Sequence, residues 1–135
     1  LRARPASELL FATQARLLVN RGQYSLAIVQ SAVAVEARIT RCVARHLTRL
    51  GKSREYVKEY RGKTLGKKLW YQTPNPRSLE VHYGGSAGLG ALLLKLRRSF
   101  TPMRNRVIHE GHVATQEEAL RCLRHMDGAL RLFPD

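Results

Sequence analysis

The sequence predicts an all-α domain, an up-and-down helical bundle of four main helices joined by loops and short helical turns. Apolar residues recur at intervals of three and four in four segments, and helix-capping or helix-stopping residues bound these segments. No segment shows the apolar–polar alternation of a strand. With 135 residues, 44% of them hydrophobic, the chain can bury a core, so residues 1–135 are treated as one domain. It begins with Leu1 rather than Met, which leaves open that it is excised from a longer protein.

The first helix is predicted from about residue 7 to residue 20, between Pro5 and a stop at Asn20-Arg21-Gly22. The second and longest helix is predicted from about residue 23 to residue 50, with Gly51 closing it. Its apolar residues are expected to share one side; they are Val29, Ala32, Val33, Ile39, Val43, Leu47 and Leu50.

Charged residues on the second helix give two expectations. Arg38, Arg41, Arg45 and Arg49 follow spacings of 3, 4 and 4 opposite the apolar side, where they form either a solvated face or a surface that tracks phosphates. Glu36 instead projects near the centre of the apolar side.

A carboxylate at the position of Glu36 is costly unless it is paired. Arg104 or His109 would serve as its partner from another core-facing helix. The pair is either a structural salt bridge or part of a site.

Residues 52–72 mix aromatic residues with lysines and predict two short helical stretches split by Gly62. Tyr56 and Tyr60 would share a helix face, where they either stack on bases or lie at the edge of the core. A loop is expected at residues 73–90, in which His82 and Tyr83 have the most obvious chemical use.

A third long helix is predicted from about Leu89 to Gly111. Its apolar face continues in phase past Thr101-Pro102, so we expect the proline to kink or restart the helix rather than end it. Thr115 and Glu118 have the spacing of a capping box, and the last helix is predicted to run from there to about Phe133.

The formal net charge of +14 indicates a polyanionic partner. Residues 38–77 hold twelve Lys and Arg against two Glu, whereas residues 107–135 hold three basic and five acidic residues. Polyanion contact is therefore expected in the middle of the chain. The candidate RNA-binding residues are Arg38, Arg41, Arg45, Lys67, Lys68, Arg97, Arg98 and Arg106.

Cys42 and Cys122 have neither a disulfide framework nor metal-ligand spacing, and we expect them to be small core or boundary residues in a reducing, cytoplasmic setting. No apolar run approaches the roughly 18 residues of a membrane span, so no membrane contact is expected. His109 and His112 are three apart and straddle Gly111, unlike the helical zinc pattern. We therefore expect no metal and no cofactor.

The segment Arg104-Asn105-Arg106-Val107-Ile108-His109 carries the chemistry. Arginine offers a permanent charge and a planar fork of donors suited to phosphate. Histidine can give or take a proton near neutral pH. Together they suit metal-free phosphodiester cleavage, in which a clamp holds the oxyanion and an acid or base serves the oxygen.

On an ideal helix Arg104 and His109 lie about 140° apart with roughly 7.5 Å of rise between them. Their convergence therefore requires either that the helix ends near His109, as Gly111 permits, or that a second copy of the chain supplies the missing group.

These residues resemble the HEPN domain family, in which an Arg-Asn pair is followed, after a short spacer, by His and then by a capped final helix. The stretch Gln23-Tyr24-Ser25-Leu26-Ala27 leading to Val35-Glu36-Ala37 is similar to the family's corresponding helix. The similarity covers most of the chain in helix order and length.

The resemblance implies a helical bundle that dimerises so that two motifs face each other. Many such proteins are metal-independent endoribonucleases of toxin–antitoxin, antiviral-defence and RNA-processing systems; others are non-catalytic. Arg104 would contact the scissile phosphate, His109 would act as acid/base or orient the 2′-hydroxyl, and Asn105 would position them. Glu36 completes the predicted catalytic set, and the products would be a 2′,3′-cyclic phosphate and a 5′-hydroxyl.

We therefore predict a homodimeric, metal-independent endoribonuclease related to toxins or antiviral defence. Its expected partners are RNA, a second copy, and either an antitoxin or an additional domain of the same protein. In a subset paired with nucleotidyltransferase antitoxins, a modified tyrosine stands where this chain has Gly111, so that regulation is not expected. The alternative is a non-catalytic RNA- or nucleotide-binding dimerisation module of a larger protein.

Overall fold

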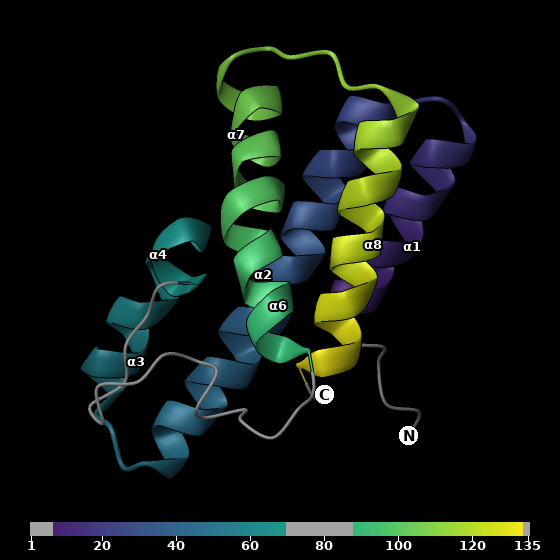
Figure 1. The fold of residues 1–135 in the computed structure, drawn as a ribbon. Coiled ribbons are helices and arrows are strands. Elements are labelled where there is room, and N and C mark those ends of the chain that lie inside the picture. Colours follow the sequence, from purple (N-terminus) through teal and green to yellow (C-terminus); the bar gives the residue numbers. More distant parts are fainter. Residues whose placement is uncertain (1–6, 70–87, 134–135) are drawn as a thin grey trace.

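The computed structural model describes residues 7–69 and 88–133, and all regular elements in these ranges are helical (Figure 1). The elements are α1 (Ser7–Asn20), α2 (Tyr24–Arg49), α3 (Arg54–Arg61), α4 (Leu65–Leu69), α6 (Leu89–Lys95), the π-helical turn η1 (Leu96–Phe100), α7 (Thr101–His109) and α8 (Gln116–Leu132). The predicted all-α fold class is confirmed for the described residues. Most of the predicted loop, including His82 and Tyr83, lies outside them.

Helix α2 lies at the centre of the arrangement. It packs against α1, α7 and α8, while α3 and α4 cover its C-terminal half. Figure 1 shows α1 and α2 running in opposite directions, and α7 and α8 doing the same across the turn that joins them. Among the described helices, none combines the length and the apolar character needed to cross a membrane.

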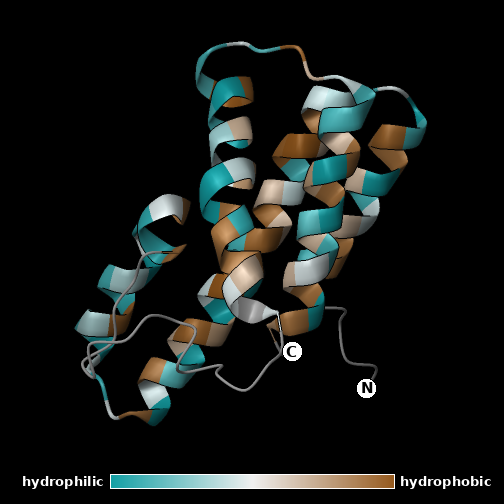
Figure 2. Ribbon diagram, viewed as in Figure 1, coloured by the Kyte–Doolittle hydropathy of each residue, from teal (hydrophilic) through white to brown (hydrophobic). Residues whose placement is uncertain are grey.

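The apolar sides of the helices face one another, as the colouring of Figure 2 shows. The largest fully buried side chains include Ile28, Ile39, Leu47, Leu93, Leu96, Phe100, Met126 and Phe133. Cys42 and Cys122 are also buried, as predicted. Burial raises the pKa of both thiols, that of Cys122 to about 11, so both stay protonated at neutral pH.

The buried face of α2 differs from the predicted one. Val33 is 38% exposed and Val29 is half-buried, whereas Ala27, Ala34 and Ala44 are almost completely buried. Because α2 has neighbours on several sides, its alanines allow the backbones of those neighbours to approach closely. A pattern weighted toward large apolar residues does not detect this use of small ones.

Pro102 does not end its helix, which confirms the prediction. Proline has no N–H to donate to the preceding turn. Just before it, the N–H of Thr101 bonds to the carbonyl of Leu96, five residues back, so one wide turn absorbs the disruption. The helix then continues as α7, and Met103 and Val107 pack against the core.

Candidate functional site

The predicted motif lies on α7 and is only partly buried. Arg104 is half-buried and its Nη1 donates a hydrogen bond of 2.9 Å to Oδ1 of Asn105. His109 is exposed and is the last residue of α7. Because both residues lie in regular helix, about 140° of rotation separates them. A single chain therefore does not bring the arginine and the histidine together.

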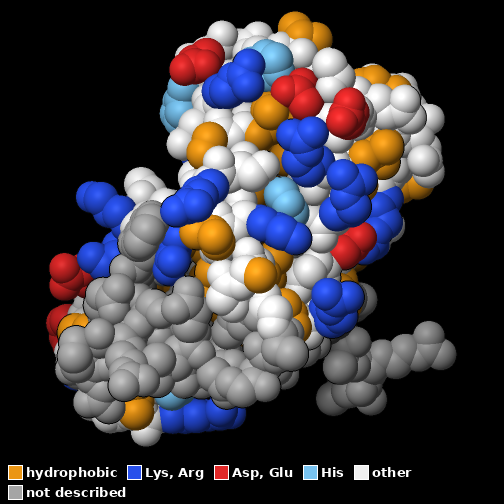
Figure 3. Space-filling model, viewed as in Figure 1, with side chains coloured by type: hydrophobic (Ala, Val, Ile, Leu, Met, Phe, Trp, Pro, Cys, Tyr) orange, Lys and Arg blue, Asp and Glu red, His pale blue; other side chains and the backbone are white. Residues whose placement is uncertain are grey.

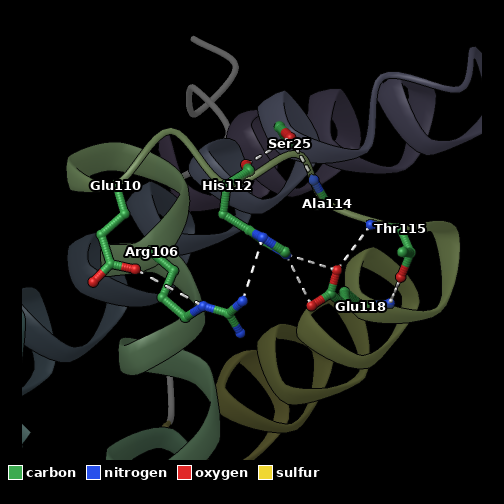
Figure 4. Close-up of polar contacts among 7 residues, drawn as sticks. All are labelled: Ser25, Arg106, Glu110, His112, Ala114, Thr115 and Glu118. Carbon is green, nitrogen blue, oxygen red and sulfur yellow. Dashed lines mark hydrogen bonds and ion pairs between the residues drawn. The ribbon is translucent and has the colours of Figure 1, made fainter.

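The turn after His109 is held by backbone and side-chain hydrogen bonds (Figure 4). The N–H groups of Glu110 and His112 both donate to the carbonyl of Arg106, at 3.1 Å each. Between them, Gly111 has a φ of +66°, a left-handed conformation that glycine adopts without strain. The hydroxyl of Ser25 accepts from the N–H of Ala114 at 2.9 Å and so ties the turn to α2.

His112 lies between α7 and α8 and contacts both. Its Nε2 lies 3.0 and 3.1 Å from the two carboxylate oxygens of Glu118, and its Nδ1 lies 3.3 Å from Nη2 of Arg106. This network assigns the proton of the neutral ring to Nε2, which donates to Glu118, while Nδ1 accepts from Arg106. His112 thereby fixes the end of α7, where His109 stands.

Glu118 also completes the predicted capping box, which is confirmed. The hydroxyl of Thr115 accepts from the N–H of Glu118 at 3.2 Å, and a Glu118 carboxylate oxygen accepts from the N–H of Thr115 at 2.9 Å. The hydrogen bond from the Thr115 backbone, followed by that from His112, lowers the pKa of Glu118.

The structural role of His112 was not predicted from the sequence, in which this residue was considered only as a metal ligand beside His109. In the structure its ring turns toward Glu118, and the described residues hold no group of three or more His, Cys, Asp or Glu side chains that could bind a metal ion. The sequence does hold a signal for this contact. His112 stands six residues before Glu118, the glutamate of the predicted capping box, and this spacing places both residues at the start of the last helix.

Glu36 does not have the partner that the sequence suggested. Its carboxylate accepts from Nζ of Lys68 on α4 at 3.2 Å, and 33% of its side chain is exposed. Lys68 also donates to the hydroxyl of Thr40 at 2.9 Å. The expectation of Arg104 or His109 as partner is wrong, because α4 covers α2 at this point.

Glu36 instead lines an open cleft of about 560 Å³ between the start of α1, the middle of α2 and the α3–α4 segment. Lys68 and Arg61 also line it. Arg104 and His109 are not among its lining residues, so the structure does not bring together the four predicted catalytic residues within one chain.

The predicted arginine stripe on α2 is only partly at the surface. Arg38 is 3% exposed, and its Nε donates to the buried carboxylate of Glu8 at 2.8 Å. Its Nη1 donates at 2.9 Å to the carbonyls of both Leu130 and Phe133 at the end of α8. The prediction that Arg38 lies opposite the core is therefore wrong: Glu8 and the end of α8 draw it inside.

Arg41 is half-buried and also donates to Glu8. Burial acts to raise the pKa of Glu8, but the hydrogen bonds from Arg41, from its own backbone and from Arg38 outweigh this effect and leave the pKa below its usual value.

The remaining candidate RNA-binding residues divide into two groups. Lys68 is buried, and Arg97 is half-buried with its Nε donating to the carbonyl of Leu69 at 3.0 Å, so both hold the fold together. The exposed members are Arg45, Lys67, Arg98 and Arg106. Tyr60 is a core residue at 1% exposure, so it cannot stack on a base, whereas Tyr56 is half-buried with Nζ of Lys52 lying 5.0 Å from the centroid of its ring. Trp70 and Tyr71 lie outside the described residues.

Comparison of the chain with protein-family models, with curated proteins and with solved structures finds no match. The HEPN interpretation therefore stays a prediction based on the motif and the helix order.

Proposed function

We propose that the chain is a metal-independent endoribonuclease of the HEPN type, whose active site is assembled between two copies. The observation that carries the proposal is the placement of Arg104 and His109 on α7. His109 is exposed at the helix end, and the anchored turn behind it limits its movement. Arg104 is turned to another side of the helix.

The two residues fit the two needs of RNA cleavage. The 2′-oxygen of the substrate attacks the adjacent phosphorus, and the bond to the 5′-oxygen breaks, which leaves a 2′,3′-cyclic phosphate and a 5′-hydroxyl. His109 exchanges a proton with one of these oxygens. Arg104 donates to the non-bridging oxygens as negative charge grows on them, and Asn105, bonded to Arg104, holds the guanidinium in place.

A second copy is needed because one α7 presents Arg104 and His109 on different sides. Twofold symmetry would place one helix end against the other, so that His109 of each copy meets Arg104 of its partner. An apolar side chain beside His109 remains exposed and supports such pairing: Ile108 on α7 is 43% exposed. A second copy that met this helix end would cover it.

The RNA strand would be held by the exposed cations among those predicted, namely Arg45, Lys67, Arg98 and Arg106. Contacts of this kind are insensitive to base sequence and weaken with salt. The family's roles in toxin–antitoxin and antiviral-defence systems make cellular or invading RNA the proposed class of substrate.

The direct test is incubation of the protein with labelled RNA in EDTA, beside the His109→Ala variant. Because His109 is exposed, the substitution leaves the fold intact, which circular dichroism checks. The expected result is fragments with cyclic-phosphate ends that only the wild type produces, and equal RNA affinity for both proteins. If both samples leave the RNA uncut and bind it with equal, salt-dependent affinity, the chain is instead the non-catalytic binding module.

A further inference from the structure

A second charged feature lies between α6 and α8, outside the motif. Here the structure holds a pocket of about 340 Å³, within the range of roughly 300–1,000 Å³ that is typical of small-ligand sites. Lys95 enters it from α6, and Arg124, His125 and Arg131 enter it from α8. Figure 3, drawn from the same side as Figure 1, shows Lys and Arg side chains gathered over α8 and the facing part of the α6–α7 helix.

The cations of this pocket are not used by the fold. Lys95, Arg124 and Arg131 are exposed, and in the described part of the chain none of them forms an ion pair. No carboxylate is among the described residues that line the pocket. Asp127 on α8 points elsewhere, because it pairs with Arg16 of α1 at 2.5 Å.

This arrangement contrasts with Arg38 and Lys68, whose charges are matched by Glu8 and Glu36. Three unmatched cations around one hollow create a positive potential that favours an anion.

The pKa of His125 depends on the charges that surround the pocket. Its ring is half-buried and meets the ring of Phe100 edge-on, with centroids 6.3 Å apart. Its Nδ1 is buried and has no hydrogen-bond partner among the described residues. Burial, and then Lys95, Arg124 and Arg121, lower the pKa of His125. An anion bound among these cations would oppose their effect on the ring.

We propose that the α6–α8 pocket binds a phosphate group, carried either by a small phosphate ligand or by the backbone of an RNA strand. The two arginines offer paired donors that match the oxygens of phosphate, and Lys95 adds a point charge from the opposite wall. The pocket draws on α8, in which three acidic residues balance three arginines, so a count of charge along the sequence does not reveal these cations. Phosphate binding here does not depend on cleavage by the α7 motif.

The test measures the binding of inorganic phosphate and of pyrophosphate by calorimetry, using wild type, Arg124→Gln and Lys95→Gln. The matched control is Arg49→Gln, which removes the same charge from an exposed position at the end of α2. We expect each pocket variant to bind pyrophosphate at least about tenfold more weakly, as for the loss of one charge-assisted hydrogen bond, while the control stays near the wild type. In wild type, saturation with phosphate should raise the pKa of His125 in an NMR titration.

A 2′-O-methyl RNA oligonucleotide, which cannot be cleaved by its 2′-oxygen, separates the two sources of phosphate. Loss of oligonucleotide affinity in Arg124→Gln, with a salt dependence reduced by about one phosphate contact, assigns the pocket to the strand backbone. Loss confined to pyrophosphate assigns it to a small ligand. The proposal would be overturned if Arg124→Gln and Arg49→Gln bound both probes with equal affinity. It would also be overturned if the protein bound polyglutamate but neither of the two phosphate probes. None of these outcomes depends on whether the chain cuts RNA.

Discussion

Arginines on a single helix serve opposite purposes in this chain. Arg38 is buried, bonds to Glu8 and satisfies two carbonyls at the end of α8, whereas Arg45, seven residues later, is exposed. Both were predicted on one stripe from their spacing alone. The sequence could not separate them, because the carboxylate that draws Arg38 inward comes from a different helix.

Arg38→Ala should lower the free energy of unfolding by about 3 kcal/mol, because it leaves the buried Glu8 with one cation fewer and uncaps α8. Arg45→Ala, the matched control, should change it by no more than about 0.5 kcal/mol. Urea denaturation followed by circular dichroism measures both. Equal effects of the two substitutions would show that the Glu8–Arg38 pair does not stabilise the fold.

Glu8 should also make stability depend on pH. Its pKa in the folded state lies below the ordinary value of 4.5, so the unfolded chain binds a proton at Glu8 more readily than the folded one. The stabilisation is therefore complete above pH 4.5 and is lost as the pH falls from there through the folded pKa. Denaturation measured between pH 6 and pH 3 should show that Glu8→Gln loses less stability on acidification than the wild type does. The same dependence of the free energy of unfolding on pH in both proteins would contradict this role of Glu8.

At the scale of the elements, boundaries were easier to predict than faces. The stop at Asn20-Arg21-Gly22, the capping box at Thr115 and the continuation past Pro102 depend on local chemistry, and all three were predicted. The buried face of α2 was not, because it depends on which helices pack around it. The anchoring of His112 by Glu118 was missed for the same reason: it joins two elements.

Thr115→Ala should destabilise the protein by about 1 kcal/mol, because it removes the side-chain acceptor at the start of α8. Thr13→Ala is the matched control inside α1, where threonine is a poorer helix former than alanine. The control should raise the stability slightly. Thermal unfolding measures the stability of the two variants. If both were less stable than the wild type, the loss in Thr115→Ala could not be attributed to the helix cap.

At the scale of the whole molecule, the described helices share one hydrophobic core, but one copy does not bring together the residues of the proposed site. Figure 1 shows α2 flanked by α1, α7 and α8, and this arrangement holds α7 at the surface with His109 at its exposed end. The sequence predicted that Arg104 and His109 would not converge on one regular helix, and both residues lie in α7. Neither the cation cluster between α6 and α8 nor the partner of Glu36 could be predicted, because each depends on how separate helices pack.

The measurement that tests the composite site most directly is cleavage of labelled RNA in EDTA by mixed dimers of Arg104→Ala and His109→Ala. Each variant alone should be inactive. If His109 of one copy works with Arg104 of the other, a mixed dimer keeps one intact site, and an equal mixture should recover up to about a quarter of the wild-type activity. No recovery in a mixture shown by native mass spectrometry to contain mixed dimers would contradict a site shared between two copies.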